Sequence, residues 1–225
     1  CFKAARECGA PVVSIAGGEP LMHPQIVEIV EGLIAMKRFI YLCTNAILLK
    51  DYLDRLPVSP YLTLSVHLDG MEEEHDRIVD QKGTFKLAIE AVKEAKKRGF
   101  RVTSATTFFD NTTVEMAEEF LDYLAPLGMD GVTMASAFRY PDAPDQDHFF
   151  GRRRTFEFFD KLLAKNKKGR SVLVTCLQKK NMWAKKFEKI WGIGTFRYVR
   201  SKTPLVATWL DPYRLCTVIA KKKIM

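Results

Sequence analysis

The run Gly17-Gly18-Glu19-Pro20 closes the first apolar segment of this chain. Residues 10–16 before it are rich in apolar, β-branched side chains and carry no charge, which predicts a buried strand. Two glycines let the backbone turn and bring its amides close to a ligand, because a Cβ would hinder that approach. The glutamate can accept hydrogen bonds from an ammonium group, and the proline stiffens the exit. The turn is therefore a candidate ligand site, with an ordinary strand-to-helix turn as the alternative.

Polar side chains also lie near the ends of the following apolar segments. In the segment 61–68 and just after it, alternation places every second residue on one face of a strand, where polar groups could bind a ligand. Hydrogen bonding within the strand ends is the alternative for each. His67 changes charge near neutral pH and could also donate to a reaction intermediate. The candidates are Thr44, Asn45, Ser65, His67, Asp69, Thr106 and Thr107.

The chain has five cysteines, an odd number whose spacings resemble no disulfide framework. Such usage suits a reducing cytoplasm. From the residues alone, Cys43 is most simply a small buried hydrophobic side chain in a strand. Cys1 and Cys8 lie two helical turns apart and could face one core. The remaining two are Cys176 and Cys216.

Apolar strand-like segments alternate with amphipathic stretches over the first two-thirds of the 225 residues. The alternation predicts a parallel sheet with right-handed crossovers, either doubly wound or a (β/α) barrel, and both place a ligand at the carboxyl ends of the strands. No G-x-G-x-x-G run supports a dinucleotide fold. The expected strands are 12–16, 39–44, 61–68, 101–109 and 131–138, and the expected helices begin near 24, 85, 114 and 152.

The charge is distributed unevenly along the chain. Residues 1–151 carry 15 basic and 23 acidic side chains, whereas residues 152–225 carry 20 basic and 4 acidic ones, a net charge of +16. We therefore divide the chain into a core, residues 1–150, and a basic extension, residues 151–225. The extension could attract anionic lipid or nucleic acid, or be a solvated face. No RNA-binding motif accompanies the charge, so nucleic acid is not expected. No apolar run is long enough to span a membrane.

Four segments together resemble one family: the Gly-Gly-Glu-Pro turn, residues 42–46, residues 65–70 and the long run 143–155. They are similar to the adenosylhopane synthases, the radical S-adenosylmethionine (SAM) enzymes of hopanoid biosynthesis. The resemblance is continuous from about residue 1 to about residue 163. Beyond it, Trp191-Gly192 with Thr195 resembles a Trp-Gly-x-x-Thr element of the same family. The final 25 or so residues do not match.

The resemblance implies an α/β fold, a partial (β/α) TIM-like barrel that lacks its first strand and cluster loop. It implies SAM and a [4Fe–4S] cluster as cofactors and hopene (diploptene) as substrate, to whose terminal alkene the 5′-deoxyadenosyl radical adds. An external electron donor and a cytoplasmic location at the inner membrane face would go with that reaction. The chain has no C-x3-C-x2-C run to hold the cluster. We therefore expect a fragment that is inactive alone.

The resemblance also assigns roles to individual residues. The Gly-Gly-Glu turn would hold the amino group of SAM, and the other polar strand ends its methionyl and ribose groups. Cys43 would donate a hydrogen atom to the carbon radical left by the addition, because a thiol S–H bond is weaker than the C–H bond formed. Two alternatives are another radical SAM enzyme and a non-catalytic SAM-binding remnant. The predicted cofactor-binding residues are Gly17, Gly18, Glu19, Asn45, Ser65, His67, Asp69 and Thr106.

Overall fold

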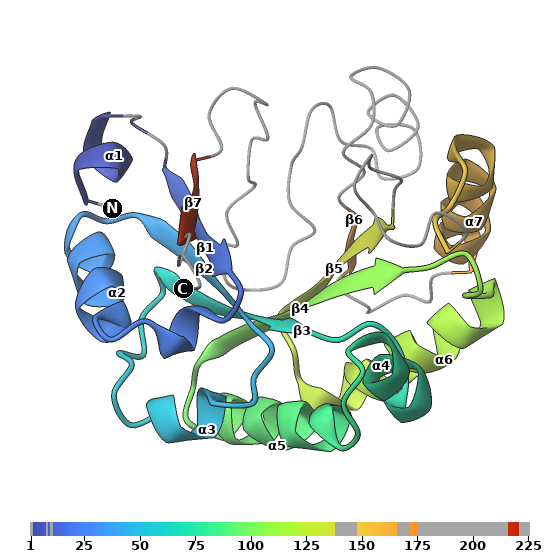
Figure 1. Cartoon of the computed structure of the whole chain (residues 1–225), viewed down its shortest axis with the longest axis horizontal. Helices are drawn as coiled ribbons and strands as arrows, with labels where there is room; N and C mark the ends of the chain where they lie inside the picture. The colour runs from blue at the N-terminus through green and yellow to red at the C-terminus, as the bar shows by residue number, and fades with distance from the viewer. Residues whose placement is uncertain are drawn as a thin grey trace.

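The computed structural model describes residues 2–7, 9, 11–137, 148–165, 172–174 and 216–220. Their centre is a seven-stranded sheet in the order β6-β5-β4-β3-β2-β1-β7, and every pair of neighbours is parallel. The sheet curves as an open arc with helices along its outer side (Figure 1). The predicted α/β fold, a partial barrel of parallel strands alternating with helices, is confirmed. The strands are β1 (Val12–Gly17), β2 (Phe39–Thr44), β3 (Leu62–His67), β4 (Arg101–Phe108), β5 (Gly131–Ser136), β6 (Val172–Val174) and β7 (Cys216–Ala220).

The helices begin and end where local chemistry predicts. The hydroxyl of Thr113 accepts a hydrogen bond from the Met116 amide and caps the helix that follows it. Gly99 and Gly128 have φ of +87° and +68°, so each ends a helical segment in a conformation that favours glycine. The α-helices are α1 (Phe2–Glu7), α2 (Ile26–Ala35), α3 (Leu49–Tyr52), α4 (Glu72–Ile78), α5 (Thr84–Lys97), α6 (Val114–Leu124) and α7 (Arg152–Ala164), and the 3₁₀ helices are η1 (Pro20–Met22) and η2 (Ala125–Leu127).

The two faces of the sheet differ in chemistry. Side chains such as Ile40, Leu42 and Leu64 are at most 1 % exposed and form the core between the sheet and the outer helices. The residues between them in the sequence point to the inner, concave face, and paired strands carry this alternation across the sheet in register. The inner-face residues are mostly hydroxyl, thiol or imidazole side chains: Ser14, Tyr41, Cys43, Thr63, Ser65, His67 and Thr103.

The extension 151–225 contributes three described elements to the same body. Helix α7 packs on α6, and the rings of Phe158 and Phe159 lie 5.2 and 6.3 Å from that of Phe108. Strands β6 and β7 pair with β5 and β1. The sequence predicted α7 and a strand over residues 171–177, which contains the whole of β6, but it did not predict β7, α3 or α4. The boundary between core and extension at residue 150 stays a prediction. None of the helices among the described residues has the length and apolar character needed to cross a membrane.

Several sequence-predicted features lie outside the described residues. These are Cys1, Cys8, Cys176, residues 143–147 of the run 143–155, and the segment that contains Trp191-Gly192 and Thr195. Among the described side chains, Cys43 is a free cysteine.

Candidate functional site

The turn after β1 presents open backbone at the carboxyl end of the sheet. Gly17 has φ of +149°, a conformation that side chains disfavour. A Cβ added at Gly18 would meet no atom within 4 Å, so the space above this backbone is free. Both glycines are exposed. The turn can therefore approach a ligand through its main chain, and its role as a ligand site stays a prediction.

The carboxylate of Glu19 ties the ends of β1 and β2 together. Its Oε1 accepts hydrogen bonds from the Leu21 amide at 3.0 Å and the Thr44 hydroxyl at 2.9 Å, and its Oε2 accepts one from the Asn45 amide at 2.8 Å. The Thr44 hydroxyl accepts in turn from the Ala46 amide at 3.0 Å. A carboxylate offers about four lone-pair positions, so roughly one remains for a ligand. Glu19 is thus a structural tether as well as a candidate ligand-binding group.

Asn45 closes the turn that follows β2. Its Oδ1 accepts a hydrogen bond from the Ile47 amide at 3.0 Å, which fixes the side chain. The side-chain NH₂ has no hydrogen-bond partner among the described residues and is half-buried. It is therefore a donor available to the carboxylate of a ligand.

The thiol of Cys43 lies on the inner face and not in the core between sheet and helices. Its Sγ is 3.5 Å from the Ser14 hydroxyl and 4.0 Å from the Tyr41 carbonyl. Cys43 is paired in register with Ser65 on β3, which is paired with Thr103 on β4. The Thr103 hydroxyl is buried and has no partner among the described residues, so this row has an unused hydrogen-bonding group.

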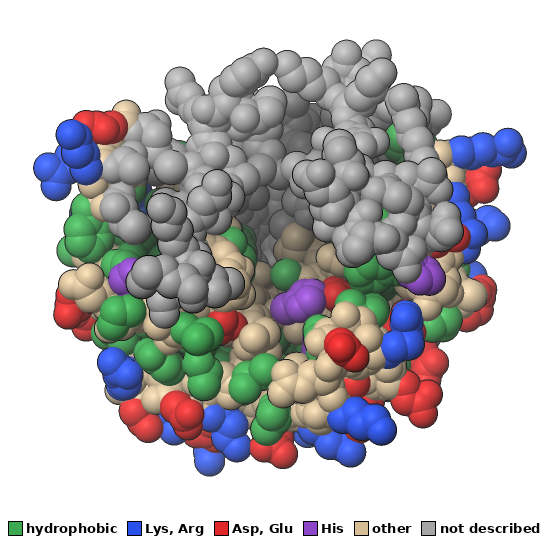
Figure 2. Space-filling model, in the orientation of Figure 1, with side chains coloured by type: hydrophobic (Ala, Val, Ile, Leu, Met, Phe, Trp, Pro, Cys, Tyr) green, Lys and Arg blue, Asp and Glu red, His purple; other side chains and the backbone are tan. Residues whose placement is uncertain are grey.

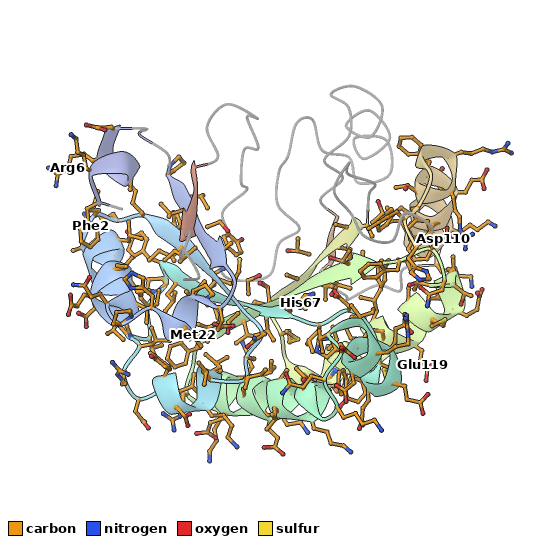
Figure 3. All side chains as sticks on the ribbon, in the orientation of Figure 1. Phe2, Arg6, Met22, His67, Asp110 and Glu119 are labelled. Atoms are coloured by element: carbon orange, nitrogen blue, oxygen red, sulfur yellow. The ribbon has the colours of Figure 1, made fainter. Side chains whose placement is uncertain are left out.

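Asp69 and His67 form a closely bonded pair at the carboxyl end of β3. His67 Nε2 is 2.5 Å from Asp69 Oδ2, and the side chains of the histidine and the aspartate are 40 % and 2 % exposed. Asp69 Oδ1 accepts from the Thr107 amide at 2.7 Å, while the Asp69 amide donates to Nδ1 of His75 at 3.2 Å. Figure 3 shows His67 at the middle of the sheet. Both carboxylate oxygens of Asp69 are engaged, so this residue orients His67.

The two histidines have opposite electrostatics. Burial disfavours the charged form of His67, but the hydrogen bond and the negative charge of Asp69 outweigh it and raise the pKa of His67. Burial, and then the nearby charge of His67, lower the pKa of His75. His75 Nε2 is buried without a partner in the described part of the chain. His67 is therefore the group that can carry a proton, and His75 is held neutral.

Thr106 does not join the other predicted site residues. It is 2 % exposed, its hydroxyl is 3.2 Å from that of Ser104, and it pairs in register with the core residue Met134. It therefore lies on the helix-covered face. Thr107, the next residue, is on the inner face. The sequence analysis assigned Thr106 to the wrong face of the strand. The apolar Phe108, two residues further along the strand and therefore on the same face as Thr106, could have indicated the correct one.

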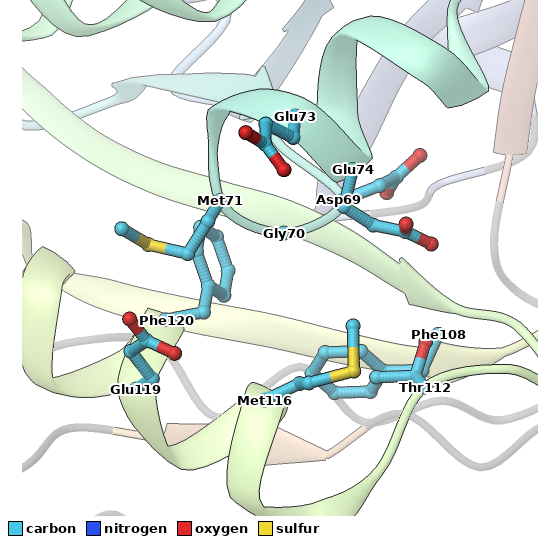
Figure 4. Close-up of a pocket in the computed structure, with 10 residues that line it drawn as sticks. All are labelled: Asp69, Gly70, Met71, Glu73, Glu74, Phe108, Thr112, Met116, Glu119 and Phe120. Carbon is cyan, nitrogen blue, oxygen red and sulfur yellow. The ribbon is translucent and has the colours of Figure 1, made fainter.

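A cavity of about 170 Å³ opens beside Asp69, between the loop after β3 and helix α6 (Figure 4). Phe108 and Phe120 line its apolar side, and Glu73 and Glu119 are exposed carboxylates among its lining residues. Charged side chains gather over the outer helices, whereas uncharged groups and a histidine occupy the centre of the view in Figure 2. No pattern in the sequence predicted the cavity beside Asp69.

The residues fit SAM better than they fit an iron–sulfur cluster. Open glycine backbone, a free amide donor on Asn45 and the unpartnered buried hydroxyl of Thr103 match the amino-acid and ribose groups of SAM. No C-x3-C-x2-C run occurs in the sequence. In the described part of the chain, no three His, Cys, Asp or Glu side chains converge on a metal position. These residues therefore do not fit a [4Fe–4S] cluster.

The curved parallel sheet brings the polar strand ends of neighbouring strands to one edge, where a ligand can bind. Residues 2–124 match the profile of the radical SAM superfamily. Because this match covers more than half of the chain, the chain belongs to that superfamily.

The curated relatives differ in their reactions. The chain is 31 % identical over 105 residues to GTP 3′,8-cyclase 1 of Mycobacterium tuberculosis, which covers 44 % of this chain and 29 % of the relative. It is 27 % identical over 114 residues to the AdoMet-dependent heme synthase of Methanosarcina barkeri, covering 50 % of this chain and 33 % of that protein. The chain thus spans about a third of the length of these relatives.

Two solved structures support the fold. SuiB of Streptococcus suis superposes with a TM-score of 0.66 at 18 % identity, covering 78 % of this chain and 41 % of that one. A radical SAM methyltransferase of Sphaerobacter thermophilus gives a TM-score of 0.55 at 21 % identity, over 77 % of this chain and 53 % of that one. At these identities the likeness concerns the fold alone.

Proposed function

We propose that this chain acts in a radical SAM enzyme that joins the 5′-deoxyadenosyl group to the terminal alkene of hopene and forms adenosylhopane. The resemblance of the run 143–155 and of the strand-end motifs supports this substrate. The structural observation that carries the proposal is the free thiol of Cys43 on the inner face, one residue before the Thr44 that Glu19 holds. A reaction that ends in a carbon radical needs a hydrogen donor at such a place.

The strand ends would hold SAM by its polar groups. The open backbone at Gly17 and Gly18 and the remaining lone pair of Glu19 suit the ammonium group, and the Asn45 amide suits the carboxylate. Ser65 and His67 lie further along the same inner face and would contact the ribose hydroxyls. When bound and cleaved, SAM supplies the 5′-deoxyadenosyl group. Thr106 has no part in this site.

Cys43 would complete the reaction. A carbon–carbon bond forms between C5′ and the terminal alkene carbon, and the unpaired electron is left on the neighbouring carbon. The Cys43 thiol gives that carbon a hydrogen atom and becomes a thiyl radical. One electron from an external donor and one proton then restore the thiol, so atoms and electrons balance.

The basic extension suits a membrane-dissolved substrate. Its net charge of +16 would attract the protein to anionic lipid at about 1 kcal/mol for each basic residue near the surface. We therefore place the protein in the cytoplasm, in peripheral contact with the inner membrane face. Hopene would be taken from that surface.

Another radical SAM reaction is the second candidate. The chain is 31 % identical to a GTP cyclase over 105 aligned residues, so a polar nucleotide is a specific alternative to hopene as the substrate. The two differ in substrate solubility: one reaction would need membranes, and the other would proceed in buffer.

The test is to express the complete enzyme that contains this chain in a bacterium that makes hopene but no adenosylated hopanoid. Lipids would be extracted and analysed by mass spectrometry. The proposal predicts adenosylhopane with the native sequence and a lower yield with Cys43→Ala. Cys43→Ser is the matched control for size, because its O–H bond is too strong to donate readily. A SAM-consuming protein that leaves the lipids unchanged would overturn the proposal.

A further inference from the structure

Cys43, Ser65 and His67 form a row on the inner face of the sheet. Cys43 and Ser65 are paired in register on neighbouring strands, which places their Cα atoms about 5 Å apart. His67 is two residues further along β3 and on the same face, about 7 Å from Ser65 along the strand. Ser65, whose hydroxyl can both donate and accept, is therefore the residue between Cys43 and His67 in this row.

The imidazole of His67 is held for proton transfer through one nitrogen. Its Nε2 is bonded to the carboxylate of Asp69, a residue whose side chain is 2 % exposed. Two hydrogen bonds fix Asp69: the Thr107 amide donates to its carboxylate, and the Asp69 amide donates to Nδ1 of His75. This leaves Nδ1 of His67 for another partner. Among the described residues, Asp69 and His75 are the titratable groups that face His67, from the loop after β3 and from α4. Because the His67 side chain is 40 % exposed, it can exchange protons with solvent.

We propose that His67 supplies the proton that returns Cys43 to its thiol form in each reaction cycle, through Ser65 or a water, with Asp69 as the positioning residue. This inference rests on the proposed function, since it concerns the recovery of the hydrogen donor. It assigns His67 proton transfer in addition to the ribose contact proposed above, and it assigns Asp69 the positioning of His67 in place of the ribose contact that the sequence suggested.

The step balances in atoms and charge. The Cys43 thiyl radical takes one electron from the external one-electron reductant and becomes a thiolate. The thiolate takes a proton from Nδ1 of the His67 imidazolium, and His67 becomes neutral with its remaining proton on Nε2 toward Asp69. Solvent then reprotonates His67. The raised pKa of His67 keeps the imidazolium available near neutral pH.

The test measures the reactivity of Cys43 in the 225-residue chain, without cofactor. Iodoacetamide alkylates thiolates, and peptide mass spectrometry reports the rate at Cys43 separately from the other cysteines. When His67 loses its charge, the thiolate beside it loses a stabilising neighbour. The alkylation rate plotted against pH should therefore show an inflection where His67 titrates.

Variants separate coupling from a change of fold. His67→Gln should abolish the inflection, and Asp69→Asn should shift it to lower pH because the imidazolium loses its partner. Glu73→Gln is the matched control, since this exposed carboxylate lies on α4, near Asp69 in the chain, and should leave the profile unchanged. NMR titration of the histidine ring protons would assign the inflection, and circular dichroism would confirm that each variant is folded.

An alkylation profile that is the same in the native chain and in His67→Gln would overturn the proton-transfer role. Failure of the proposed function has a different signature. If the inflection is present but the lipid assay yields no adenosylhopane, the coupling stands and the substrate assignment fails. Adenosylhopane formation without the inflection would refute the role of His67 alone.

Discussion

Glu19 offers the sharpest test of how the site is built. Its carboxylate accepts three hydrogen bonds, at 2.8 to 3.0 Å, from groups on the turn after β1 and at the end of β2. Glu19→Ala removes the acceptor for all three donors and separates the two strand ends. Glu19→Gln keeps the shape but points an NH₂ group at one of these donors.

The magnitude follows from the number and kind of bonds lost. A hydrogen bond to a charged group contributes about 1.5–3 kcal/mol, but Glu19 is only half-buried and water can replace part of each bond. We therefore expect Glu19→Ala to lower the free energy of unfolding by about 2–4 kcal/mol, and Glu19→Gln by about 1–2 kcal/mol. For a chain of this size, about 2–4 kcal/mol corresponds to a fall in Tm of roughly 4–16 °C.

Urea unfolding followed by circular dichroism measures these differences. Glu31→Gln on α2 is the matched control, because Glu31 is exposed and no hydrogen bond or ion pair holds it among the described residues. Its free energy of unfolding should stay within about 0.5 kcal/mol of the native value. If Glu19→Ala changed the free energy of unfolding as little as this control does, the Glu19 hydrogen bonds between β1 and β2 would not stabilise the fold. That result would refute the proposed role of Glu19 as a structural tether.

Three further predictions concern the whole chain. Anaerobic reconstitution with iron and sulfide should give no stable [4Fe–4S] absorption, since the sequence has no C-x3-C-x2-C run to hold the cluster; a stoichiometric, SAM-responsive cluster would contradict this. The chain should bind anionic vesicles weakly, and added salt should release it, because residues 152–225 carry a net charge of +16; equal binding to neutral vesicles would exclude electrostatic attraction. Stability should fall as pH drops through the ordinary histidine pKa of 6.5, because the lowered pKa of His75 means that the unfolded chain binds more protons. The raised pKa of His67 acts oppositely, with a contribution present below 6.5 and lost as pH rises through its folded value. In urea titrations at several pH values, His75→Gln should flatten the fall in stability below pH 6.5, and His67→Gln should remove the loss of stability above pH 6.5; slopes identical to those of the native chain would show that neither histidine carries the linkage.

Hydrophobic periodicity was enough to predict most of the fold. Each of the first five strands was predicted to within two residues at either end, because β-branched runs alternate with amphipathic helices and glycines such as Gly99 end the helices. The short helices α3 and α4 and the edge strand β7 were missed. Four or seven residues give no clear helical period, and an edge strand in a basic segment has no pattern of its own.

The candidate site was predictable in its location but not in its bonding. The motifs placed Glu19, Cys43 and His67 near the carboxyl ends of the strands, which parallel topology brings to one edge. Sequence could not show that the Asp69 carboxylate is fully engaged, or that His75 fixes its backbone, because these contacts depend on how the loop folds back. Thr106 was misplaced since one residue of parity moves a side chain to the opposite face.

Deuterium incorporation tests the role of Cys43 most directly. In heavy water the thiol exchanges its proton for a deuteron, whereas carbon-bound hydrogens of SAM and hopene do not. The enzyme that contains this chain should therefore make adenosylhopane with deuterium at the carbon next to the new bond, in one stereochemistry, and Cys43→Ala should give a lower yield or mixed stereochemistry by mass spectrometry and NMR. Product that carries no deuterium at that carbon, or that keeps its rate and single stereochemistry in Cys43→Ala, would contradict hydrogen donation from Cys43.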